Sequence, residues 1–237
     1  MSDEAISIYN QDGTIKSKED FLHDVENIYD SIVSESIYDN DNMENIITDP
    51  EVNLDEEQII SNFNYLSRSL YITGEITQEI SNRIFQMINL WNEIDSSNDI
   101  KDEERNPIKI YINTPGGDLD ATFSIIGAIK ASKTPIHTIT IGQAYSGGFL
   151  IQISGDKKFC YPYSAFLFHE GSSFDCGDAH KFIQHTEFYK TQLSIMKDLI
   201  LSNTKISESE YECHHKDDWF ITSKEAVEKG IVDIILE

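Results

Sequence analysis

The stretch that decides the fold is residues 135–149, PIHTITIGQAYSGGF. Its first part, 135–143, is rich in β-branched residues and predicts a buried strand. A serine and two glycines follow, and the apolar run 149–153 predicts a short helix. Because strands that alternate with helices build layered α/β folds, the stretch predicts an α/β domain. Ser146 would stand at a strand-to-helix junction.

The same order of strand, turn and helix occurs upstream. Residues 107–114, PIKIYINT, predict a buried strand that enters the turn Pro115-Gly116-Gly117 and then a helix over 119–131. Before it, 69–75 predicts a strand and 76–95 a long helix. The remaining predicted elements are strands at 158–161, 165–169 and 231–236, a long helix at 178–202, and helices that open at the capping patterns 207–210 and 222–225.

Charge divides the chain of 237 residues into two parts. Residues 1–57 hold 17 Asp or Glu against two Lys, and the net charge of the whole chain is -24. We expect 1–56 to be an acidic N-terminal extension, partly disordered or propeptide-like, and 57–237 to be the folded domain. The hydrophobic content of 39% is enough for a core in that domain.

Composition argues against several classes of partner. An acidic surface repels nucleic-acid phosphates and anionic membranes, so we expect no nucleic-acid or membrane binding. The sequence has no run of about 18 apolar residues and no apolar stretch at its acidic N-terminus, so neither a membrane span nor a secretory signal is predicted. Three cysteines without a Cys-x-x-Cys pair indicate a reducing cytoplasm. No metal and no cofactor is expected.

Ser146 and Gly116-Gly117 each allow two interpretations. At the start of a helix, the Oγ of Ser146 could act as a nucleophile beside backbone N–H groups that stabilise an oxyanion. It could equally be an N-cap serine. The glycine pair could let the backbone approach a bound group or could form an ordinary tight turn.

His169 and Asp218 are the other candidates for chemistry. His169 ends an apolar strand, where a general base would be oriented and still accessible, although a structural core histidine is the commoner case. Asp217 and Asp218 precede the apolar pair Trp219-Phe220, and either could orient a histidine or belong to a solvated charge run.

From about residue 67 to 237 the chain resembles the proteolytic subunit of the Clp protease, a serine peptidase. Five motifs carry the resemblance in order: INTPGG (112–117), GQAYSGG (142–148), FCYPYS (159–164), Phe168-His169, and DWFIT (218–222) with the later Glu225-Ala226 and GIVD (230–233). The resemblance implies a crotonase-like α/β spiral of repeated β-β-α units, with a protruding handle helix at about 178–202.

The resemblance also implies the roles of five residues. Ser146 would be the nucleophile, His169 the general base and Asp218 the orienting acid, while Gly117 and Gly147 would supply the oxyanion-hole N–H groups. The implied partners are polypeptide substrates, further copies in heptameric rings stacked as a tetradecamer, and an AAA+ Clp ATPase.

The sequence departs from the family pattern near the chemistry. Gly147 replaces a methionine, Glu170-Gly171 replaces Gln-Pro, and the acidic extension stands where the family has a short N-terminal segment. From the resemblance we expect an active serine endopeptidase. Three alternatives stay open: a non-catalytic ring subunit, a crotonase-fold acyl-thioester enzyme, or a phage-type protease that matures capsid or scaffold proteins.

Overall fold

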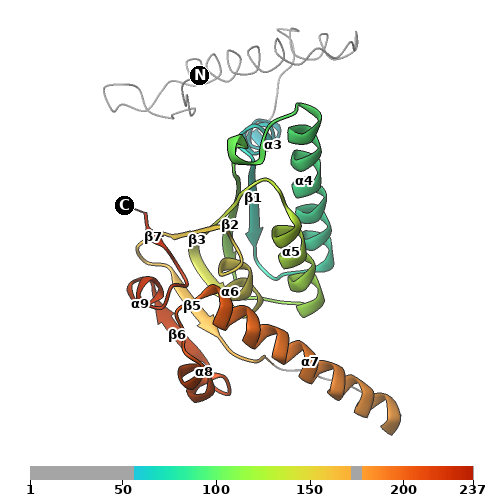
Figure 1. The fold of residues 1–237 in the computed structure, drawn as a ribbon, viewed down its shortest axis with the longest axis vertical. Helices are drawn as coiled ribbons and strands as arrows, with labels where there is room; N and C mark the ends of the chain where they lie inside the picture. Colours follow the sequence, from blue (N-terminus) through green and yellow to red (C-terminus); the bar gives the residue numbers. More distant parts are fainter. Residues whose placement is uncertain (1–55, 172–177, 237) are drawn as a thin grey trace. The chain divides into compact units, whose positions relative to one another are not determined.

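The computed structural model describes residues 56–171 and 178–236, which excludes nearly all of the expected extension 1–56. Figure 1 shows strands and helices alternating along the chain. In order, they are α3 (Glu56–Leu66), β1 (Ser69–Thr73), α4 (Gln78–Ser97), η1 (Asp102–Glu104), β2 (Ile108–Thr114), α5 (Leu119–Ala131), β3 (Ile136–Tyr145), α6 (Gly147–Gln152), β4 (Lys157–Cys160), β5 (Ala165–Phe168), α7 (Ala179–Asn203), α8 (Glu208–His214), β6 (Trp219–Thr222), α9 (Ser223–Glu228) and β7 (Ile234–Ile235). The predicted α/β class is confirmed.

All seven strands of the described ranges form one sheet. Its main order is β1-β2-β3-β4-β7, and every pair along this path is parallel. Strand β3 changes its partner along its length: the residues up to Thr140 pair with β4, and Gln143 to Tyr145 pair with β5. β6 is antiparallel to β5. The carboxyl ends of β3 and β5 and the amino end of β6 therefore lie at one edge of the sheet.

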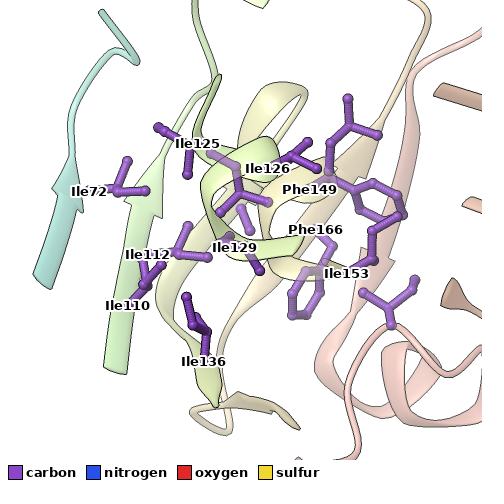
Figure 2. Packing of buried hydrophobic residues seen from close by; sticks show 14 of the residues in the cluster. Ile72, Ile110, Ile112, Ile125, Ile126, Ile129, Ile136, Phe149, Ile153 and Phe166 are labelled. Carbon is purple, nitrogen blue, oxygen red and sulfur yellow. The ribbon is translucent and has the colours of Figure 1, made fainter. Parts of the chain in front are cut away.

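The core lies between the sheet and helices α4, α5 and α6. In β2, alternate side chains from Ile108 to Thr114 are buried, while Lys109 and Tyr111 between them are half-buried. Figure 2 shows isoleucines of β1 and β2 facing those of α5, with Phe149 of α6 and Phe166 of β5 beside them. Burial of each such side chain stabilises the fold by roughly 1.5–3 kcal/mol.

Helix α7 is the predicted handle, and its two halves differ. The C-terminal half buries Gln192, Met196 and Ile200 against the domain. The N-terminal half projects away from the sheet in Figure 1 and exposes Phe182, Ile183 and Phe188. No helix in the described part of the chain is long and apolar enough to cross a membrane.

Two predicted features near the C-terminus differ from the structure. The strand expected over 231–236 is limited to β7, because the N–H groups of Ile231 and Val232 both donate to Ala226 O in the turn that ends α9. These two side chains are buried all the same. Strand β6 was not predicted, since its four residues run directly into the capping box of α9 at Thr222.

Candidate active site

Ser146 lies in a tight turn between β3 and α6. Its backbone has φ 53° and ψ -117°, a conformation that non-glycine residues seldom adopt and that costs about 1–3 kcal/mol. The N–H donates to Leu167 O at 2.9 Å, and the carbonyl accepts from Phe149 N at 3.0 Å. Although Ser146 occupies the N-cap position of α6, its hydroxyl makes no capping hydrogen bond. Helix capping therefore does not explain this serine.

The turn at Gly116 and Gly117 packs closely on the Ser146 turn. A Cβ at Gly116 would lie 2.7 Å from Ser146 Cβ, and one at Gly117 would lie 2.3 Å from Ile76 O. Both glycines have positive φ, 102° and 154°. Glycine is required here because no other residue has the space. The turn is fixed by hydrogen bonds from Ile76 N to Gly116 O and from Asp118 N to Ile76 O, which do not use the N–H of Gly117.

Close packing explains why residue 147 is a glycine, which the sequence did not reveal. A Cβ at this position would lie 2.4 Å from Thr122 Oγ1 and 3.2 Å from Ile76 Cδ1. Thr122 is fully buried on α5, and its hydroxyl donates to Asp118 O at 2.8 Å. The space beside the Ser146 turn is therefore filled from α5, and the glycine leaves no cavity.

His169 and Asp218 are joined by strand register. Phe168 of β5 pairs with Trp219 of β6, so the next residue of β5 and the preceding residue of β6 face each other. His169 Nδ1 and Asp218 Oδ1 are 3.0 Å apart. Since a carboxylate only accepts, Nδ1 is the donor, and the Nε2 of a neutral imidazole is left as an acceptor. The side chains are 33% and 61% exposed.

The structure brings Ser146 to the same sheet edge as this pair. Tyr145 pairs with Leu167, which places Ser146 beside the last residue of β5 and one position short of His169. The hydroxyl of Ser146 and the imidazole of His169 are nevertheless not hydrogen-bonded. All five residues expected to act thus lie on neighbouring turns and strand ends, with the bond between nucleophile and base not formed.

Glu170 forms a second carboxylate–imidazole pair next to the first. Its Oε1 lies 2.5 Å from His215 Nδ1, and its N–H donates to His215 O at 3.3 Å. The His215 ring stacks on Tyr211 with a centroid distance of 5.2 Å. The carbonyl of Glu170 accepts from the Tyr189 hydroxyl of α7 at 2.7 Å. The sequence indicated only a charge beside His169 and gave no sign of this partner.

The model of the family described as "Clp protease" matches residues 54–237. This chain belongs to the Clp protease family. It is similar to the ATP-dependent Clp protease proteolytic subunit 2 of Treponema denticola, with 31% identity over 71% of this chain and 82% of that protein. It is also similar to the protein of the same name from Treponema pallidum, with 27% identity over 72% of this chain and 83% of that one. The predicted family is confirmed.

Two cysteines of this Clp family chain lie within the described residues. Cys160 is buried on β4, and burial raises the pKa of its thiol to about 11. Cys213 is exposed on α8. Within residues 56–171 and 178–236, no group of three His, Cys, Asp or Glu side chains is arranged to hold a metal ion.

Proposed function

We propose that this chain is a serine endopeptidase that hydrolyses unfolded polypeptides through an acyl-enzyme. The observation that carries the proposal is the His169–Asp218 hydrogen bond at the sheet edge where Ser146, whose hydroxyl caps no helix, directly follows β3. Membership of the Clp protease family supports a peptidase.

In the proposed mechanism, Ser146 Oγ attacks the carbonyl carbon of the scissile bond and His169 Nε2 accepts the hydroxyl proton. The N–H groups of Gly117 and Gly147 donate to the oxyanion that develops. The imidazolium, oriented by Asp218, then protonates the leaving amine as the C–N bond breaks. Water, deprotonated by His169, hydrolyses the acyl-enzyme and restores Ser146.

The proposal requires that Ser146 Oγ approach His169 Nε2 during the reaction. Catalytic hydrogen bonds are often long without substrate and shorten in the complex. The unformed bond in this structure also favours a second candidate, a non-catalytic ring subunit. Peptide hydrolysis separates the two, because a non-catalytic subunit would fold and assemble without it.

We propose further that the chain works in the cytoplasm as heptameric rings stacked in a tetradecamer, with an AAA+ ATPase supplying substrates. The exposed apolar residues of the α7 N-terminal half support a contact between copies. The relatives are named ATP-dependent proteolytic subunits, which supports an ATPase partner. The family match begins at residue 54, which supports a peptidase domain over 57–237 with 1–56 as an extension.

A fluorophosphonate probe tests the nucleophile. We expect the probe to label the wild-type chain and the control Ser124→Ala, an exposed serine on α5, and to spare Ser146→Ala. Hydrolysis of a fluorogenic peptide is expected to follow the same pattern. Equal labelling of Ser146→Ala and the wild type would overturn the assignment.

A further inference from the structure

Two chain segments meet beside the candidate site: the base segment, residues 168–171, and the acid segment, residues 214–219. Each contributes one imidazole and one carboxylate to the contact. His169 of the base segment pairs with Asp218, and Glu170 pairs with His215 of the acid segment. The two pairs therefore link the same two segments twice, with the chemical groups exchanged.

Asp218 has little support of its own. Its side chain is 61% exposed, and among the described residues its only hydrogen bond is the one to His169. The bond to His169 selects the rotamer of Asp218, and it can form only if the backbone of Asp218 lies within reach of the imidazole. The position of Asp218 thus depends on how the backbone of the acid segment is fixed next to the base segment.

The β5–β6 pairing fixes the end of the acid segment at Trp219, and the Glu170–His215 pair fixes it on the other side of Asp218. His215 is three residues before Asp218, its side chain is only 13% exposed, and it is bonded to Glu170 through both side chain and backbone. The stacking of His215 on Tyr211 orients the imidazole toward Glu170. Charge-assisted hydrogen bonds of this kind are stronger than neutral ones and set a defined geometry.

Glu170 also connects the base segment to α7. Its carbonyl accepts from the Tyr189 hydroxyl, and burial, followed by the nearby charge of Glu170, raises the pKa of Tyr189. The pKa of Tyr211 is raised to about 12, again by burial first and then by Glu170. Both phenols are therefore protonated at neutral pH, and that of Tyr189 donates to the Glu170 carbonyl. Glu212 and Lys197 complete the charged surroundings of His215 and Tyr211.

We infer that Glu170 and His215 are positioning residues that hold Asp218 against His169. The inference rests on the proposed function, because it assigns the pair a role in orienting the general base. The carboxylate beside the base is thereby paired with an imidazole and positions the acid segment.

A double-mutant cycle tests the inference on the full chain. We expect Glu170→Ala and His215→Ala each to lower kcat about 10- to 100-fold with KM within about twofold of wild type, since misplacement of a catalytic group mainly affects turnover. The kcat of the double variant should be no lower than that of the less active single variant. His215→Asn, whose amide nitrogen lies near the position of Nδ1, should recover most of the loss. Glu104→Ala, an exposed η1 carboxylate paired with Lys101, is the matched control and should behave as wild type.

A second background separates positioning from general destabilisation. In Asp218→Ala, the further change Glu170→Ala should alter kcat less than about twofold, because the group to be positioned is gone. Losses that multiply in the double variant, or a Glu170→Ala effect that persists without Asp218, would overturn the inference. So would wild-type kcat in both single variants.

Proton NMR spectra of the histidine imidazoles test the inference without a measurement of catalysis. In wild type we expect a strongly downfield Nδ1–H proton resonance for His169 bonded to Asp218, and its loss in Glu170→Ala. An unchanged resonance overturns the inference even if the chain is an active peptidase. If the wild type shows the resonance, Glu170→Ala loses it, and the fluorophosphonate does not label the wild type, only the proposed function is contradicted.

Discussion

The two sides of the candidate site are built differently. The glycine turns, residues 114–117 and 145–148, are fixed by close packing: Gly116 lies against Ser146, and Gly147 lies against Thr122. The base and acid segments are fixed by hydrogen bonds between partly exposed side chains. Changes in the glycine turns should therefore act mainly on stability, whereas changes in the paired segments should act mainly on turnover.

Asp218→Asn should have the largest effect. We expect kcat to fall on the order of 10²- to 10⁴-fold, because the amide no longer holds His169 in the acceptor tautomer. Stability should change by less than about 0.5 kcal/mol, since the side chain is largely exposed. Peptide hydrolysis and urea unfolding measure the two quantities. Asp217→Asn is the matched control, and if it lost as much activity as Asp218→Asn the choice between these carboxylates would be wrong.

Gly117→Ala should give the largest loss of stability. The new Cβ would lie 2.3 Å from Ile76 O, a backbone atom that cannot rotate away, so we expect a loss of roughly 3 kcal/mol in unfolding free energy. Gly127→Ala on α5 is the control, because nothing lies within 4 Å of its added Cβ. That control should gain up to about 1 kcal/mol from helix propensity. Similar unfolding midpoints for both variants would contradict the packing described for the glycine turns.

Gly147→Ala should cost about 1–3 kcal/mol, and Thr122→Ala should recover part of the loss. The clash involves side-chain atoms of Thr122, so truncation of the threonine removes it. Chemical unfolding of the two single variants and the double variant gives the coupling energy. Additive losses would mean that Thr122 is not what excludes a side chain at position 147.

The last prediction concerns two cysteines outside the compared regions and has the least bearing on the site. Burial raises the pKa of the Cys160 thiol to about 11, so at pH 8 almost none of it is thiolate. In a Cys176→Ser background, iodoacetamide should modify exposed Cys213 at least about 100-fold faster than Cys160. Mass spectrometry of timed samples measures both rates, and urea should abolish the difference. Equal rates in the native protein would contradict the burial of β4.

The fold was predictable from the sequence where local pattern determines structure. Apolar runs with adjoining turns predict most of the parallel strands and place Ser146 at a strand-to-helix junction. The five ordered motifs predict the family. The roles of Ser146, His169, Asp218, Gly117 and Gly147 stay predictions, although the structure places all five on neighbouring turns and strand ends.

Contacts between distant positions were not predictable. The pairing of β6 with β5 places His169 and Asp218, 49 residues apart, opposite each other, and no local pattern of four residues determines such a register. Glu170 and His215 are 45 residues apart. The sequence shows a glycine at position 147 but not its contact with the Thr122 side chain, which requires it. Periodicity describes one element at a time, whereas these contacts depend on how elements meet.

The antiparallel pairing of β5 with β6 has a consequence for the order in which the protein is made. During translation, Ser146 and His169 are synthesised well before Asp218, which follows His169 by 49 residues. At about 5–20 residues per second, this interval lasts about 2 to 10 s. A nascent chain therefore lacks Asp218 until β1 to β5 and helices α3 to α8 have been translated. Ribosome-bound chains cannot assemble the proposed triad before the domain is almost complete.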